Sequence, residues 1–136
     1  PEESLHQLAL YAKDYDINVI VENHGHLSSH ADWLVPIIEK VGLPNCGTLP
    51  DFGNFYEYDR YQGVQEMMPY AKGVSAKTNV FDEQGNEANV NYEKMLQIVK
   101  NAGYSGYIGI EYEGANNDED EGIRKTKKLL STLGRI

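Results

Sequence analysis

The sequence predicts an α/β fold of parallel βα units of the (β/α)8-barrel type, with about four units, or half a barrel, present. Along the whole chain, stretches with apolar residues at helical spacing alternate with short strand-like stretches. Strands separated by helices run parallel and are joined by right-handed crossovers. The chain has 136 residues, whereas a complete barrel takes roughly 250. No linker or low-complexity segment divides the chain, so we expect residues 1–136 to form a single domain.

The first half of the chain is expected to hold two helices and two strands in alternation. Residues 2–15 place leucines and alanines on one face of a helix, behind an acidic first turn. Residues 18–22 have the apolar character of a buried strand. Residues 27–42 again show helical spacing, with one of their first two serines as the N-cap and a glycine at the end. Residues 45–52 form a short second strand.

The second half is expected to continue this alternation. Strands are predicted over residues 73–78 and 107–112, and helices over 59–73, 91–103 and 118–134. The last helix is acidic at its start and basic further on, which the helix macrodipole favours. A polar loop with a glycine turn precedes the fourth helix, and its spacing lacks the full pattern of a calcium loop.

Composition argues against several classes of partner. The formal net charge is −9, and no patch of Lys or Arg is interleaved with aromatic residues, so we expect no nucleic-acid binding, which normally needs a basic surface. No apolar run approaches the roughly 20 residues of a membrane span, and no signal peptide is visible. The compartment stays open, with the cytoplasm as the default and export as the alternative. The single cysteine, Cys46, excludes an internal disulfide and a CxxC zinc site and is expected to be a small buried thiol.

Three of the predicted strands end at an acidic residue. "VIVEN" ends near Glu22, "TLPDF" near Asp51 and "IGIEY" near Glu111. In parallel α/β folds the carboxyl ends of the strands face the ligand site. Three carboxylates brought together there would repel one another, so either their pKa values rise or a cation lies between them. Oxygen ligands suit Mg²⁺ or Mn²⁺, and an added imidazole would shift the preference toward Mn²⁺, Co²⁺ or Zn²⁺.

Each of these acids taken alone has a simpler interpretation, as a helix cap or a solvated loop residue. The same placement in three units weakens that interpretation. The anchors Glu22, Asp51, Ser75 and Glu111 lie 29, 24 and 36 positions apart, which is one βα unit each.

The segments "VIVENHGH", "CGTLPDFGNF", "AKGVSAKT" and "GYIGIEYEG", in this order, resemble the C-terminal half of the xylose-isomerase-like TIM-barrel superfamily, the sugar phosphate isomerase/epimerase group. The resemblance covers essentially the whole chain. It implies a divalent metal held by Glu22, Asp51 and Glu111. Relatives supply a histidine where this chain has Ser75, and hydroxyl oxygen is a poor ligand. His24, two residues after Glu22 on the same side of an extended segment, is the expected substitute.

The resemblance further implies a sugar or sugar phosphate isomerase or epimerase that moves a proton between adjacent carbons through an enediolate. Glu22 and Glu111 would be the acid–base pair and Asp51 a ligand alone. Lys77 would steady an oxyanion or replace part of the missing metal charge. Its simpler interpretation is an ion pair with Glu111 or Asp51.

Candidate substrate-binding residues are His26, Asn54, Ser75 and Tyr112. Tyrosine rings pack on sugar C–H faces while their hydroxyls form hydrogen bonds. The simpler interpretation of the tyrosine is packing at the rim, and that of His26 is a loop residue bonded to backbone.

Two other functions stay open. One is a Schiff-base enzyme of aldolase type, or a lyase, with Lys77 as nucleophile. (A lyase or hydratase acting on oxidised sugars belongs with the metal-assisted isomerase, because it would use the same enolate chemistry.) The other is a non-catalytic carbohydrate-binding module.

Half a barrel would leave two open sheet edges and an apolar inner face. We expect this chain to be a fragment of a parent of about 280 residues, whose N-terminal half completes the barrel. The alternatives are two copies that close around a shared core, or an open sheet. Isolated, the chain is expected to have weak or no activity.

Overall fold

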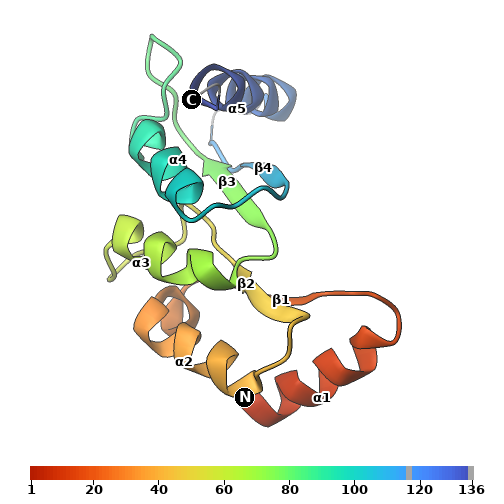
Figure 1. Ribbon diagram of the computed structural model, residues 1–136. Coiled ribbons are helices and arrows are strands. Elements are labelled where there is room, and N and C mark those ends of the chain that lie inside the picture. The colour runs from red at the N-terminus through yellow and green to blue at the C-terminus, as the bar shows by residue number, and fades with distance from the viewer. Residues whose placement is uncertain (116–117, 135–136) are drawn as a thin grey trace.

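The computed structural model describes residues 1–115 and 118–134 (Figure 1). Its helices are α1 (Glu2–Lys13), α2 (Ala31–Val41), α3 (Arg60–Met67), α4 (Tyr92–Asn101) and α5 (Glu119–Leu133). Its strands are β1 (Val19–Glu22), β2 (Cys46–Leu49), β3 (Val74–Thr78) and β4 (Ile108–Tyr112). Two 3₁₀ turns, η1 (His26–Ser29) and η2 (Met68–Tyr70), join these elements. The predicted alternation of helices and strands is confirmed.

All strand pairing between the named strands is parallel. β1 pairs with β2, and β3 pairs with β4. The two pairs are connected by parallel bridges from Thr48 to Ala71 and from Asp51 to Ser75. The strands therefore follow one another in sequence order, and their carboxyl ends lie on the same rim, as half of a barrel requires.

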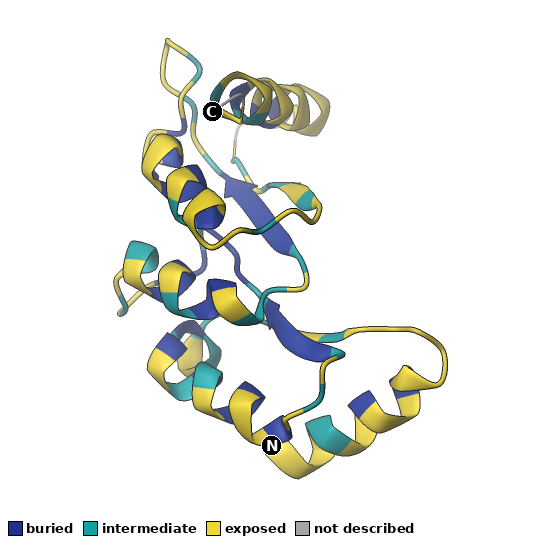
Figure 2. Cartoon of the chain, in the orientation of Figure 1, coloured by how far each residue is buried: buried dark blue, intermediate teal, exposed yellow. Residues whose placement is uncertain are grey.

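Helices cover one side of these strands. Figure 1 shows α2, α3 and α4 along that side, while no described helix covers the opposite side between α1 and α5. The buried core lies between the helices and the strands, where the dark blue segments of the ribbon face one another in Figure 2. It includes Leu34, Ile38, Val64, Met67, Val74, Ala76, Met95, Val99 and Leu129. Cys46 is buried as expected.

The uncovered face is less apolar than expected on β3 and β4, whereas Ile20 of β1 and Leu49 of β2 share the face of Glu22. Side chains alternate between the two faces of a strand, so the face that carries Glu111 also carries Gly109 in β4, and Ser75 and Lys77 lie beside them in β3. Small and polar residues here make room for, and contact, the acids. The expectation of an apolar inner face is therefore wrong for β3 and β4.

Both outer edges of the strand array are open among the described residues. Ile20 on β1 is 40% exposed and Ile110 on β4 is 37% exposed, and neither strand has a second strand partner on its outer side. Leu8, placed by the sequence pattern on the packed face of α1, is 52% exposed. Further strands of a complete barrel would pair at these two edges.

One local expectation, the serine cap of α2, needs correction. The serines expected to cap α2 lie in η1, where their hydroxyls accept the backbone N–H groups of His24 and Gly25. The N-cap of α2 is His30, which makes no side-chain capping bond. The serines were misassigned because a 3₁₀ turn competes for the same residues.

None of the described helices is both long enough and apolar enough to cross a bilayer.

Tight packing of α3 gives a first prediction. A Cβ at Gly63 would overlap the ring of Phe55, which is buried. Gly63→Ala gains about 1 kcal/mol of helix propensity, but overpacking costs typically about 1–3 kcal/mol. We expect a net loss of up to about 2 kcal/mol in the free energy of unfolding, measured by urea titration.

Gly109→Ala is the matched control, because a Cβ there would meet nothing nearer than Val74 O at 3.5 Å. Equal stability of the two variants would contradict the packing argument.

Candidate active site

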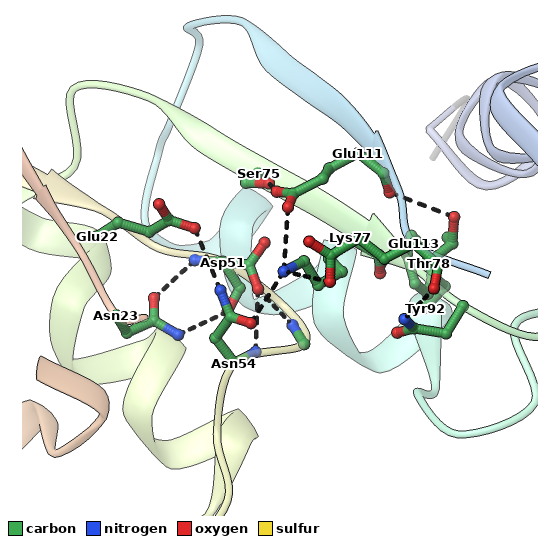
Figure 3. Close-up of polar contacts among 12 residues, drawn as sticks. Glu22, Asn23, Asp51, Asn54, Ser75, Lys77, Thr78, Tyr92, Glu111 and Glu113 are labelled. Atoms are coloured by element: carbon green, nitrogen blue, oxygen red, sulfur yellow. Dashed lines mark hydrogen bonds and ion pairs between the residues drawn. The ribbon is translucent and has the colours of Figure 1, made fainter. Parts of the chain in front are cut away.

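Three carboxylates from separate strands meet at the carboxyl rim of the strand array. Glu22 ends β1, Asp51 follows β2, and Glu111 lies in β4 (Figure 3). Each offers one oxygen, and these oxygens all lie within 4.8 Å of one another. Within residues 1–115 and 118–134, no other group of at least three His, Cys, Asp or Glu residues is arranged to hold a metal ion.

Asp51 is the buried member of this group. Its Oδ1 accepts the backbone N–H groups of Gly53 at 2.8 Å and Asn54 at 2.9 Å. Its Oδ2 is also buried and accepts no hydrogen bond from the described residues. Burial raises the pKa of Asp51 to about 6, because desolvation outweighs the hydrogen bonds that stabilise the anion.

A buried oxygen without a partner normally costs free energy. An unpaired carboxylate oxygen facing two other carboxylates is therefore a fitting place for a cation. The donor set is all oxygen, which is the set that Mg²⁺ and Mn²⁺ prefer. The residues present fit a divalent ion.

Lys77 is the cation that the sequence placed beside these acids. Its Nζ lies 3.0 Å from Glu111 Oε1 and 3.0 Å from Glu113 Oε2. Burial by itself would lower the pKa of Lys77, but hydrogen bonds to Glu111 and Glu113 outweigh it, and the pKa is raised. The ion pair with Glu111, one of the two simpler interpretations, is present.

Glu111 is held by two donors. Lys77 contacts Oε1, and the Ser75 hydroxyl donates to Oε2 at 2.8 Å. Burial would raise the pKa of Glu111, but these hydrogen bonds lower it overall. Ser75, where the resemblance implied a metal-binding histidine, thus contacts a carboxylate of the group.

Two asparagines fix the geometry of the site. Asn23 is fully buried; its Nδ2 donates to Asp51 O at 3.0 Å and its Oδ1 accepts Asp51 N–H at 2.7 Å. Asn54 donates from Nδ2 to Glu22 Oε1 at 3.2 Å and accepts from Lys77 Nζ at 2.9 Å. Because both ends of the Asn54 amide are engaged, it positions charged groups in this structure, whereas the sequence suggested a substrate contact.

The expected substitute ligand, His24, does not join the carboxylates. It is exposed, and the described metal-competent group consists of Glu22, Asp51 and Glu111 without it. The chain turns directly after β1, where His24 N–H bonds the Ser28 hydroxyl. The extended geometry on which the expectation rested ends at Glu22.

Tyr112 also lies away from the acids. It is adjacent to Glu111 in β4, so its side chain leaves the strand on the other face. There the ring stacks on Phe81, with centroids 6.3 Å apart, and fills the space at Gly122 of α5. The substrate-binding expectation for Tyr112 is not supported by this placement.

His26 lies beside a pocket on the same rim as the acids. It has a left-handed backbone, φ 50°, and lines a pocket of about 280 Å³ with Tyr56 and Glu57.

Sequence reasoning assigned no role to Asn23 or Glu113. The position of Asn23 could have indicated its role, because an uncharged polar residue at the end of an apolar strand must find a buried hydrogen-bond partner. Glu113 lies two residues beyond Glu111, at the spacing that returns a side chain to the same face of an extended segment. That spacing was the available signal for its contact with Lys77.

The fold and the site together define a parallel βα-barrel protein with an acidic cluster at the carboxyl ends of its strands. The chain belongs to the xylose isomerase-like TIM barrel family, which it matches over residues 2–133. No curated protein matches it in sequence.

Solved structures with the same fold include three enzymes or probable enzymes. D-allulose 3-epimerase from Methylomonas sp. is 17% identical with a TM-score of 0.80, over 97% of this chain and 54% of the epimerase. D-psicose 3-epimerase from Clostridium cellulolyticum H10 is 15% identical with a TM-score of 0.77, over 99% and 54%. A probable 3-DHS dehydratase from Bacillus anthracis is 17% identical with a TM-score of 0.73, over 96% and 55%. The chain thus spans about half the length of these structures, and it is confirmed as half of a TIM barrel.

Proposed function

We propose that this chain carries the metal-binding half of a sugar or sugar phosphate isomerase or epimerase. The observation that carries the proposal is the convergence of Glu22, Asp51 and Glu111 around the unpaired Oδ2 of Asp51. Membership of the xylose isomerase-like family and the fold shared with two epimerases support the reaction class.

The proposed roles follow from the placement of each side chain. Glu22, Asp51 and Glu111 would hold a divalent ion, which when bound supplies the positive charge that polarises a carbonyl and an adjacent hydroxyl. Glu22 and Glu111 stand on opposite outer strands of the array. They would remove a proton from one face of a substrate carbon and return one, by way of an enediolate. Asp51, buried and hydrogen-bonded, would serve as a ligand alone.

The Schiff-base alternative is less well supported. A Lys nucleophile must be a free, unprotonated amine, and the pKa of Lys77 is raised. Its ammonium group donates to Glu111, Glu113 and Asn54 at 2.9–3.0 Å. A lyase or hydratase on oxidised sugars would use the same three acids, so the substrate decides between that reaction and isomerisation.

We also propose a partner for the open edges. A barrel needs strands beside both β1 and β4, and the exposed Ile20 and Ile110 lie on those strands. An N-terminal half-barrel of the same protein would supply them, together with further substrate contacts from its own strand ends. A second copy of this chain is the alternative.

The proposal predicts metal-dependent exchange of substrate C–H protons with solvent. The full-length protein, incubated in D₂O with Mn²⁺ and a panel of keto sugars and their phosphates, should incorporate deuterium at a carbon next to the carbonyl. EDTA should abolish the incorporation, which proton NMR follows directly.

Borohydride trapping serves as the control for the competing mechanism. A covalent adduct on Lys77 would replace the proposal with a Schiff-base enzyme. Sugar binding without exchange, with or without Mn²⁺, would leave a carbohydrate-binding module.

A further inference from the structure

Lys77 lies between Glu111, a member of the metal-competent group, and Glu113. Its side chain is 4% exposed, and its ammonium group has three acceptors: Glu111 Oε1 at 3.0 Å, Glu113 Oε2 at 3.0 Å and Asn54 Oδ1 at 2.9 Å. An ammonium group has three N–H donors, so all of them are used. The stem is confined as well, because a Cβ at Gly53 would come within 2.7 Å of Lys77 Cδ.

The two carboxylates that accept from this ammonium group differ in whether they could also bind a metal ion. Glu111 belongs to the metal-competent group, and Glu113 does not. The backbone of Glu113 is fixed independently: its N–H donates to Thr78 O at 2.9 Å, and its carbonyl accepts Asn79 Nδ2 at 3.2 Å. Glu113 therefore stays within reach of Lys77 whatever Glu111 does.

Both oxygens of Glu111 accept hydrogen bonds, Oε1 from Lys77 and Oε2 from Ser75. A divalent ion that takes Glu111 as a ligand would lie close to the Lys77 ammonium and repel it. The hydroxyl of Ser75 carries no charge, so it can stay. The ammonium group has two remaining acceptors to move toward, Glu113 and Asn54.

We propose that Lys77 is an exchangeable internal cation, which neutralises Glu111 in the metal-free site and shifts to Glu113 and Asn54 when a divalent ion binds. The inference rests on the metal-dependent function proposed above and adds a control of metal affinity. Lys77 lets the three carboxylates tolerate one another without metal, and the ion has to compete with it for Glu111. Glu113 makes that competition easier by accepting the displaced ammonium group.

The test is Mn²⁺ binding to the full-length protein, measured by isothermal titration calorimetry. Lys77→Met should bind Mn²⁺ at least about tenfold more tightly than the wild type, since the competing charge is gone. Glu113→Gln should bind about five- to tenfold more weakly, because the ammonium group is then left to Glu111. In the Lys77→Met background, Glu113→Gln should have almost no further effect, since Glu113 acts through Lys77.

Glu57→Gln is the matched control. Glu57 is exposed on a loop of the same rim and is not among the partners of Lys77. This variant measures how far the loss of one negative charge on the rim weakens Mn²⁺ binding by long-range electrostatics alone. That effect should be well below the effect of Glu113→Gln. Lys77→Gln is a second variant in case Lys77→Met does not fold, with circular dichroism as the check.

Two outcomes overturn the inference while the metal site stands: Mn²⁺ binding that Lys77→Met leaves unchanged or weakens, or an equal effect of Glu113→Gln in both backgrounds. Binding that is unaffected by Asp51→Asn, or no binding to any of these proteins, would instead remove the metal site and with it both proposals.

Discussion

Replacing Glu22 with glutamine should lower the rate of substrate proton exchange by at least about a thousandfold, since an amide cannot act as a general base. The side chain keeps its shape, and the amide oxygen can still accept from Asn54 Nδ2, which lies 3.2 Å from Glu22 Oε1. The loss should therefore reflect chemistry more than structure. Deuterium incorporation followed by NMR measures it.

Glu22 is also a proposed metal ligand, so the measurement must be made at saturating Mn²⁺. Glu111→Gln should cause a loss of similar size, because the two carboxylates serve opposite faces of the substrate. Glu83→Gln, at an exposed position of the loop after β3, should leave the rate within about twofold of the wild type. Retention of more than roughly a tenth of the wild-type rate by Glu22→Gln would remove Glu22 from the acid–base pair.

Asp51→Asn should have opposite effects on metal affinity and on stability. Mn²⁺ affinity should fall by at least about a hundredfold, because the buried central ligand loses its charge. The metal-free protein, however, should become more stable at pH 7.5, by about 3 kcal/mol. An amide in the same place avoids the cost of a buried charge with an unpaired oxygen.

The pH dependence of this stabilisation follows from the raised pKa of Asp51. The pKa is about 6 in the folded protein, against an ordinary value of 3.8. A raised carboxyl pKa means that the folded state binds the proton more tightly than the unfolded state does. The cost of ionisation is therefore absent below about pH 4, grows between about pH 4 and 6, and is complete above about pH 6.

The stability gain of Asp51→Asn should follow the same course, near zero at pH 4 and largest at pH 7.5. Urea titrations in EDTA at both pH values measure it. Asp14→Asn, at an exposed position, controls for the general effect of removing a negative charge. A stability gain of Asp51→Asn that is as large at pH 4 as at pH 7.5 would show that burial of the charge is not its cause.

Most of the architecture was predictable because it rests on local patterns. Apolar residues at helical spacing, short apolar strands and Gly42 at the end of α2 predict the alternation of elements. The convergence of the three acids could be predicted from their positions at the strand ends, because parallel strands present their carboxyl ends on one rim. The positions of Glu22, Asp51 and Glu111 in the sequence were therefore enough to predict that they lie together in the fold.

The wrong predictions concern residues where the backbone leaves regular strand geometry, or where the face of the strand mattered more than closeness in the sequence. His24 was expected to follow the direction of Glu22, but the strand ends at Glu22 and the chain turns. Tyr112 is next to Glu111 in sequence and on the opposite face in space. Leu8 fits the amphipathic pattern of α1, but that face is buried at Ala9 and Ala12 while Leu8 is 52% exposed.

By itself, the sequence determined the parallel βα architecture, the half-barrel length and the identity of the three converging acids, because each follows from the period of a strand or helix and from the polarity of parallel strands. Only the tertiary structure decided the electrostatics of the site. It placed Lys77 between Glu111 and Glu113, engaged both ends of the Asn54 amide and left one oxygen of Asp51 unpaired. Such contacts depend on distances between side chains from different strands, which no local pattern specifies.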